Sequence, residues 1–284
     1  MAKEAALTAE EIKKLAEREA VELRRRYALG IRGLGDIFRF VEQTLKYLLV
    51  RYPLGKESLQ GFSAVYRGER LIFSNSSLIL SREIFTVAHE IGHHVFDIQL
   101  TTPTLIRDQE TGEFTPNNAL EYRADCFAAE LLMPREGIEE VASELKFKDN
   151  GISYSDIVRL QVEFGVSYRA MVRRLTELGW INKDKAQYFY HYFENTGYNL
   201  QGLFRRVHGG SLTLLVPSNQ IWVPSRYFRC LEQNYENGYV SYPVLKEILR
   251  VMGVTPDELG FEEKEPVLPE EIDFDELLKD LDED

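Results

Sequence analysis

The chain has 284 residues, of which 44% are hydrophobic, 12% aromatic and 28% charged, the proportions of a folded globular protein. This composition excludes wholesale disorder and the collagen-like and low-complexity classes. The formal net charge is −12, and the length predicts one elaborate domain or two ordinary ones.

Two features of the sequence indicate a cytoplasmic protein. No run approaches the roughly 18 consecutive apolar residues of a membrane helix, and the N-terminal segment lacks the apolar stretch of a signal peptide. The two cysteines, Cys126 and Cys230, are too few for a disulfide framework and fit a reducing compartment. We therefore expect a cytoplasmic location and no membrane partner.

Most of the net negative charge lies in residues 262–284, where twelve acids accompany two lysines. Removing the net charge of −10 in this segment from the total of −12 leaves −2 for the rest of the chain, so no general nucleic-acid-binding face is evident. We predict a flexible, solvated tail over 262–284. The alternative is a segment that imitates DNA to a basic repressor or folds on a partner.

The first part of the chain predicts two helices and three strands. Thr8 and Glu11 form the capping-box pattern of an amphipathic helix, and Asp36 is placed to cap a second helix. Short aromatic and β-branched runs bounded by turn residues predict strands, the last two of which form an antiparallel hairpin. The predicted helices cover 9–28 and 37–44, and the strands cover 47–52, 62–66 and 70–73.

A longer amphipathic helix with Ser81 as its N-cap carries the sequence SREIFTVAHEIGHHVFD. A polar connection, 101–118, leads to the helix ALEYRADCFAAELLM, which Pro134 ends. This order of strands and helices predicts an α+β domain with a small antiparallel sheet, and we assign residues 1–150 to it.

The pattern from Ser153 onward is mainly helical. SYSDIVRLQVEF and YRAMVRRLTELGW flank a short turn at Gly165, so we assign residues 151–194 to a helix-turn-helix-like segment. Residues 195–261 are predicted to contain a second hairpin, with LTLLV and IWV around Pro217-Ser218-Asn219, and then a turn and two helices. The first of these helices covers 242–252, and Thr255 and Glu258 form the capping pattern of the second. The pattern assigns no role to this last region.

Three of the five histidines lie within six residues, and two of them frame the sequence H-E-I-G-H. Four residues along a helix advance about 400°, so His89 and His93 share one face about 6 Å apart along the axis and can bind one metal ion. Zinc lowers the pKa of its bound water to about 7, and a carboxylate beside that water, here Glu90, can take the proton. This is the H-E-x-x-H arrangement of metallopeptidases. The alternative is a helix with two surface histidines.

A third ligand is expected from another segment, because catalytic zinc sites commonly use three protein ligands. Our candidate is Glu121, and Asp125 follows it on the same helical face, where it could orient His89 or His93. Asp97 is the alternative ligand. Its short side chain lies a further ~6 Å along the axis of the histidine helix, so we favour a supporting role outside the ligand set.

Three further residues are weaker candidates. Cys126 is turned about 140° away from the Glu121 face and is expected in the core. His94 is rotated about 100° from the nearest candidate ligand and is expected to pack or to hydrogen-bond. His191, inside YFYHYF, could stabilise an oxyanion, but aromatic clusters of this kind usually pack, so it is left out of the site.

Three stretches, FTVAHEIGHH, EYRADCFAAELLMP and FGVSYRAMVRRLTELGW, resemble the ImmA/IrrE family of zinc metallopeptidases. The resemblance is firm over about 61–181 and faint after residue 193. It implies a zincin-like fold, one zinc ion per chain on His89, His93 and Glu121, and Glu90 as general base.

Family members are known to cut helix-turn-helix repressors of the Xre/Cro type, which releases a mobile-element or stress regulon. The resemblance therefore implies a zinc-dependent endopeptidase with a protein regulator as its substrate. Two residues depart from the family pattern. Asp125 stands where asparagine is common, which would strengthen a hydrogen bond to histidine, and Asp97 stands where a further histidine is frequent, which could alter metal affinity.

The rival interpretation is a non-proteolytic DNA-binding regulator with a structural or vestigial metal site. The segment 156–180 would then bind DNA through the second of its two helices. The near-neutral body offers little phosphate-binding surface, so we favour the peptidase. The recognition residues of this interpretation are Tyr168, Arg169, Arg173 and Arg174.

Overall fold

The structure is a computed structural model that describes residues 7–97, 115, 118–147, 151–197 and 199–263. Most of the predicted connection 101–118 and of the predicted tail 262–284 lies outside these residues. Within them, no helix combines the length and apolar character that crossing a membrane requires. The chain divides into two compact units, Met1–Pro224 and Ser225–Asp284, and each is described by itself.

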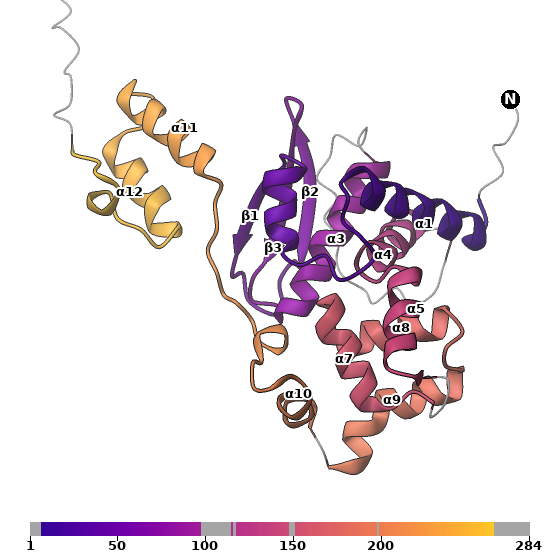
Figure 1. The fold of residues 1–284 in the computed structure, drawn as a ribbon. Coiled ribbons are helices and arrows are strands. Elements are labelled where there is room, and N and C mark those ends of the chain that lie inside the picture. The colour runs from indigo at the N-terminus through magenta and orange to yellow at the C-terminus, as the bar shows by residue number, and fades with distance from the viewer. Residues whose placement is uncertain (1–6, 98–114, 116–117, 148–150, 198, 264–284) are drawn as a thin grey trace, which may run out of the picture. The chain divides into compact units, whose positions relative to one another are not determined.

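The first unit contains a three-stranded sheet in the order β1-β3-β2 (Figure 1). The strands β2 (Gly61–Tyr66) and β3 (Glu69–Asn75) form the predicted antiparallel hairpin, with Phe62 opposite Phe73. The strand β1 (Leu48–Tyr52) pairs in parallel with the other side of β3. The sheet is therefore mixed, and the prediction of a wholly antiparallel sheet is wrong.

The central place of β3 explains this difference. Ile72, Ser74 and Asn75 have no exposed surface, which makes β3 the most deeply buried strand. Buried backbone groups need hydrogen-bond partners, so a strand at this depth must be paired along both edges. The hairpin supplies one partner and β1 supplies the other.

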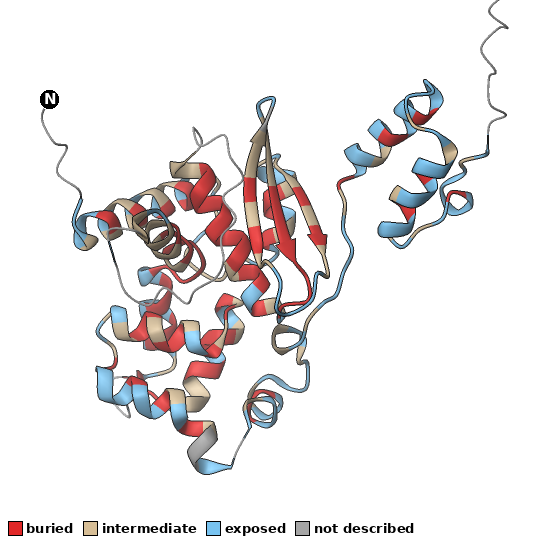
Figure 2. Ribbon diagram, turned by 180° about the vertical axis from the view of Figure 1, so that it is seen from behind, coloured by how far each residue is buried: buried red, intermediate tan, exposed pale blue. Residues whose placement is uncertain are grey.

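Helices cover the sheet on the side that carries the site. The helix α3 (Leu80–Phe96) packs on β2 and β3, and α4 (Ala119–Leu132) packs between α3 and α1 (Ala9–Arg26). Figure 2 shows the inward faces of these elements as buried. The small residues Ala16 and Ala20 are fully buried on α1, which lets α4 approach closely. The α+β class is therefore confirmed.

The predicted segment 151–194 contains α7 (Tyr154–Phe164), α8 (Tyr168–Glu177) and most of α9 (Lys183–Thr196). Gly165, with φ of +67°, ends α7 in the left-handed conformation that glycine adopts without strain. The hydroxyl of Ser167 then accepts a hydrogen bond from the N–H of Ala170 and caps α8. The remaining helical elements of this unit are α2 (Ile37–Arg39), the π-helix η1 (Phe40–Thr44), α5 (Arg135–Glu144), α10 (Leu200–His208) and the 3-10 turn η3 (Thr213–Leu215).

The start of α3 differs from its prediction. The helix begins at Leu80, one residue before the predicted cap, and its N-cap position is Ile79. The N–H of Leu80 donates to the carbonyl of Val216 at 3.0 Å. A contact with a distant segment thus satisfies a free N–H of the helix terminus, and Ser81 is buried in the first turn instead of capping it.

The predicted second hairpin around Pro217 is also wrong. Its first half contains the 3-10 turn η3, and its second half forms an isolated antiparallel bridge in which Trp222 and Arg51 exchange both backbone hydrogen bonds at 2.9 Å. A further bridge joins Pro217 to Ile79. The strand β1 is an edge strand with unpaired backbone groups. The segment around Trp222 therefore forms backbone hydrogen bonds with β1 and not with the other half of the predicted hairpin.

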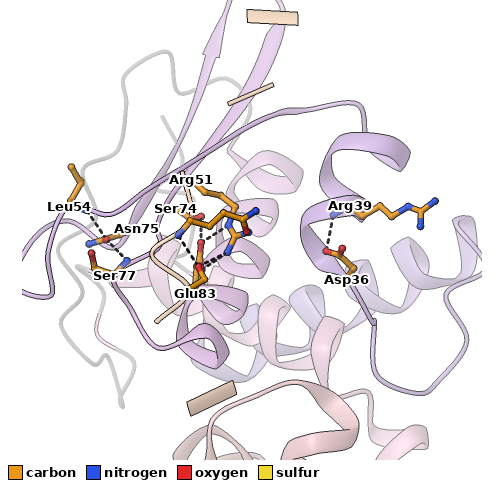
Figure 3. Close-up of polar contacts among 10 residues, drawn as sticks. Asp36, Arg39, Arg51, Leu54, Ser74, Asn75, Ser77 and Glu83 are labelled. Atoms are coloured by element: carbon orange, nitrogen blue, oxygen red, sulfur yellow. Dashed lines mark hydrogen bonds and ion pairs between the residues drawn. The ribbon is translucent and has the colours of Figure 1, made fainter. Parts of the chain in front are cut away.

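A buried ion pair joins β1 to α3 (Figure 3). The guanidinium of Arg51 donates twice to Glu83, at 2.8 Å each, and Ser74 Oγ donates to the same carboxylate at 3.0 Å. Arg51 also donates to Ser218 and Gln220 in the segment that bridges β1. One buried charge pair therefore ties together the sheet, the helix that carries the histidines and the end of the first unit.

We expect Glu83→Ala to destabilise the first unit by about 3–5 kcal/mol, because it leaves the guanidinium of Arg51 buried without its counter-charge. Urea unfolding followed by the fluorescence of Trp180 and Trp222 measures this, since both tryptophans lie in the first unit. The control is Glu22→Ala, which removes an exposed pair and is expected to change stability by less than about 1 kcal/mol. Equal effects of the two substitutions would contradict the prediction.

In its described residues, 225–263, the second unit contains two α-helices around a small core. The helix α11 (Ser225–Glu236) is joined by a turn at Asn237-Gly238 to α12 (Tyr242–Val251). Thr255 and Glu258 form the predicted capping pattern, but they cap only the single 3-10 turn η4 (Asp257–Leu259), so the helix predicted there is not formed. The buried core residues of this unit are Leu231, Tyr235, Leu245 and Leu249.

Candidate active site

Two helices bring the three predicted ligands together. His89 Nε2 lies 3.0 Å from His93 Nε2 and 3.2 Å from Glu121 Oε2, and His93 Nε2 lies 3.6 Å from the same oxygen. Tetrahedral ligands about 2.1 Å from a metal ion lie about 3.4 Å from one another. The three donor atoms are therefore spaced as one metal ion requires.

A close crossing of α3 and α4 creates this spacing. A Cβ on Gly92 would lie 3.2 Å from the Cα of Ala124 and 3.1 Å from a ring carbon of Phe127. Both distances are shorter than ordinary van der Waals contact, so a larger residue at this point would push the two helices apart. The glycine within H-E-I-G-H thus lets Glu121, one turn before Ala124, reach the histidines.

Each histidine is oriented by a carboxylate at its second ring nitrogen. His89 Nδ1 lies 2.9 Å from Asp125 Oδ1, and His93 Nδ1 lies 2.9 Å from Asp97 Oδ2. Asp97 is held in turn by an ion pair with Arg123. Donation from Nδ1–H to a carboxylate leaves each Nε2 with a free lone pair that faces Glu121. The structure thus places Asp125 beside His89 and Asp97 beside His93.

We expect Asp125→Ala to weaken metal binding about 10- to 100-fold, because His89 loses the hydrogen bond that sets its tautomer and ring orientation. Competition between the protein and a fluorescent chelator for Zn²⁺ measures this. The control is Asp184→Ala on the exposed first turn of α9. An affinity equal to that of the control would remove the orienting role from Asp125.

The electrostatics of the three side chains favour a bound cation. Burial lowers the pKa of His89, but hydrogen bonds to Asp125 and Glu121 raise it well above its ordinary value. The pKa of His93 is also raised, by Asp97 and Glu121 against the effect of burial. Burial acts to raise the pKa of Glu121, and the two histidines hold it lower, at about 2. Positive charge is thus stabilised at this point, which is the charge that a metal ion supplies.

Glu90 lies beside the three ligands with one oxygen free. Its side chain is almost fully buried, and Oε2 has no hydrogen-bond partner among the described residues. Burial raises the pKa of Glu90 above its ordinary value, so this carboxylate accepts a proton more readily than an exposed one. A Cβ on Gly61 would lie 3.4 Å from Glu90 Oε1 and 2.5 Å from Thr86 Cγ2, so the start of β2 passes directly over this glutamate.

A cavity of about 550 Å³ opens at the site. His89 and Glu90 on α3 line it, together with Asp125 on α4 and side chains from α7 and α8. A volume of this size holds a ligand the size of a few amino acid side chains. The arrangement can therefore expose a bound peptide to a metal ion and to a buried carboxylate at the same time.

The weaker candidates lie outside the ligand set. His94 Nε2 is hydrogen-bonded to the carbonyl of Leu71 at 3.0 Å, and burial lowers the pKa of His94 to about 4. Cys126 is partly buried, packs against the core and also lines the cavity. Burial raises its pKa to about 11, so the thiol is neutral. His191 is exposed and donates to the carbonyl of Gln187.

The side chains of the rival DNA-binding interpretation contact the protein itself. Tyr168 and Arg174 are buried, and Arg174 forms an ion pair with Glu130. Arg173 pairs with an acid one turn further along α8, and Arg169 lies over an aromatic ring of α9. These contacts hold α8 against α4 and α9.

Comparison with known proteins identifies the domain that carries this site. Residues 42–176 match a peptidase family described as the IrrE N-terminal-like domain. This match confirms the resemblance of this part of the chain to the ImmA/IrrE metallopeptidases. A search of the curated proteins gives no match. The matched range includes both helices of the site, so the family and the spacing of the three donor atoms both indicate a metallopeptidase.

Proposed function

We propose that the protein is a zinc-dependent endopeptidase that cleaves a protein regulator. The observation that carries the proposal is the triangle of Nε2, Nε2 and carboxylate oxygen on His89, His93 and Glu121, with the free oxygen of Glu90 beside it. A structural metal site has no need of a buried carboxylate oxygen that lines a cavity without a hydrogen-bond partner.

The donor set suits zinc. Two imidazole nitrogens and one carboxylate oxygen are the protein ligands of many catalytic zinc sites, in which a fourth position is left to water or substrate. When bound, zinc supplies a water with a lowered pKa and polarises the carbonyl to be attacked. His89, His93 and Glu121 would hold the ion, and Asp125 and Asp97 would keep the two histidines in position.

Glu90 is the general base of the proposed reaction. It accepts a proton from the water that attacks the peptide carbonyl and passes this proton to the amine that leaves. Its raised pKa suits both steps, because a carboxylate that binds a proton more readily is also able to return it within the same turnover.

The outer edge of β2 is the proposed binding line for the substrate backbone. In the described part of the chain β2 pairs with β3 alone, so its other edge has free N–H and C=O groups. An extended peptide can add to such an edge as a further strand. Because Gly61 lies next to Glu90, a peptide paired with β2 would pass the general base.

The proposed substrate is a helix-turn-helix repressor of the Xre/Cro type, and its cleavage would release a mobile-element or stress regulon. The support for this substrate is the resemblance to the ImmA/IrrE family. We further propose that the reaction takes place in the cytoplasm, where the free thiols of Cys126 and Cys230 would stay reduced.

Mass spectrometry of protein N-termini tests the proposed function. Cells that produce the wild-type chain are compared with cells that produce Glu90→Gln. New N-termini are expected in one or a few DNA-binding proteins of the wild-type cells alone, and purified zinc-loaded protein is expected to reproduce those cuts. The same set of N-termini in both cultures would contradict the proposal.

A further inference from the structure

The cavity at the site contains three buried polar side chains without hydrogen-bond partners. Gln161 has no exposed surface, and neither its Nε2 nor its Oε1 is paired with any described residue. The hydroxyls of Ser81, also fully buried, and Tyr168, 5% exposed, are likewise unpaired. All three residues line the cavity. Unpaired buried polar atoms lower stability, so a cluster of them facing one cavity indicates a bound ligand.

The three side chains surround a single junction of helices. Ser81 lies in the first turn of α3, Gln161 in the last turn of α7, and Tyr168 at the start of α8. A Cβ on Gly165, between α7 and α8, would lie 3.9 Å from Ile84 Cδ1 on α3, so these helix ends adjoin. The cavity connects this junction with the general base.

The hydrogen-bonding groups of Gln161 indicate which kind of ligand the cavity binds. Its amide offers two N–H donors and a carbonyl acceptor side by side. A carboxylate would leave the carbonyl oxygen unpaired, an ammonium or guanidinium group would leave the N–H groups unpaired, and an alkyl group would pair with neither. A primary amide pairs with both at once, and the hydroxyls of Ser81 and Tyr168 can donate or accept at its remaining atoms.

The charges around the cavity also favour an uncharged ligand. Arg174 is paired with Glu130, and Arg173 is paired with Glu177. The other two arginines that line the cavity are also engaged, since Arg82 donates to Gln60 and Arg169 lies over the ring of Tyr190. A carboxylate brought into this buried space would have to draw one of these arginines from its present contact. An amide makes no such demand.

We propose that this cavity binds an asparagine or glutamine side chain of the peptide substrate, an assignment that rests on the proposed peptidase function. Gln161 is the specificity-determining residue. From Ser81 to Glu90 is about 14 Å along the axis of α3, and an extended peptide spans about 3.3 Å per residue. The recognised residue therefore lies within about four positions of the bond that is cut.

Gln161→Leu is the variant that tests the assignment. It keeps the approximate size of the side chain and removes both unpaired polar groups, so its urea midpoint is expected to equal or exceed that of the wild type. The matched control is Gln187→Leu, which makes the same change on an exposed face of α9 outside the cavity.

Two readouts use one synthetic library of randomised dodecapeptides. In the first, the zinc-loaded full chain cuts the library and the products are sequenced by mass spectrometry. In the second, immobilised zinc-loaded Glu90→Gln retains peptides that are then sequenced. Asparagine or glutamine is expected to be enriched about tenfold or more at one position. The enrichment is expected to disappear when Gln161→Leu is added and to persist with Gln187→Leu.

The outcomes separate this inference from the proposed function. Cutting without an amide preference, or with a preference that survives Gln161→Leu, overturns the inference and leaves the peptidase in place. Retention of amide-bearing peptides by Glu90→Gln, with no cutting by the wild type, overturns the peptidase and keeps the amide site. A library that is neither cut nor retained overturns both.

Discussion

Replacing Glu90 by glutamine is expected to lower peptide cleavage by at least about 100-fold while leaving bound zinc unchanged. Glutamine keeps the size and shape of the side chain but cannot accept a proton from water. The three candidate ligands are untouched, and the hydrogen bonds of His89 to Asp125 and of His93 to Asp97 remain in place. The substitution therefore separates proton transfer from metal binding.

Cleavage rate and zinc content are measured on the same preparation of this variant. The matched control is Glu139→Gln, the same change on an exposed position of α5. We expect the control to cut at the wild-type rate, since it lies on the surface and outside the cavity. Wild-type activity in Glu90→Gln would remove the role of general base from this residue. Loss of zinc would show instead that the buried carboxylate supports the metal.

Replacing Glu121 by alanine is expected to lower zinc affinity by more than about 100-fold, because two histidines alone leave the ion with too few protein ligands. Cleavage is expected to disappear with the metal. In the wild type, Glu121 Oε2 lies 3.2 Å from His89 Nε2 and 3.6 Å from His93 Nε2. Each of the other described carboxylates paired with these histidines contacts only one of them.

Elemental analysis after reconstitution with zinc and desalting measures this loss. One zinc ion per chain is expected in the wild type and much less than one in Glu121→Ala. Leu120→Ala is the control, because Leu120 is exposed and immediately precedes Glu121 on α4. If Glu121→Ala kept a full zinc ion, the third ligand would lie elsewhere, and Asp97→Ala would then test the alternative that the spacing of the histidine helix also allows.

Together, the Glu90→Gln and Glu121→Ala variants distinguish a role in the reaction from a role in binding the metal ion. Glu90→Gln is expected to lose activity and keep zinc, whereas Glu121→Ala is expected to lose both. Loss of both in each variant would mean that Glu90 is needed to hold the metal. Loss of activity alone in each would mean that Glu121 acts in the reaction without binding the ion.

Much of the candidate site could be predicted because two of its residues, His89 and His93, lie one turn apart on a single helix. The shared face of His89 and His93 follows from the pitch of one helix, whatever surrounds that helix. The same holds for the capping interactions of Thr8, Asp36 and Thr255, since each joins residues three apart in the chain. Hydrophobic periodicity likewise predicted α1, α4, α7 and α8 with boundaries close to those observed.

Contacts between distant segments decided what local patterns do not encode. Ser81 is a good capping residue, yet the helix begins before it because Val216 supplies a hydrogen bond from far along the chain. The segment around Trp222 has the pattern of a hairpin strand, yet it pairs with β1, which has an unpaired edge. A local capping or strand preference and a tertiary hydrogen bond contribute similar free energies, so in each case the tertiary contact could override the local preference.

The sequence alone determined the helices α1, α3, α4, α7, α8 and α12, the hairpin of β2 and β3, and the spacing that makes two histidines and a glutamate candidate ligands. Only the tertiary structure decided that Arg123 holds Asp97, and that Gln161 is buried with its amide unpaired. The physical reason is that periodicity describes one face of one element, whereas the pairing of a side chain depends on which other elements pack against it. A glutamine in an amphipathic helix is usually solvated, and here the packing of α3, α7 and α8 buries it in a cavity beside the candidate metal site.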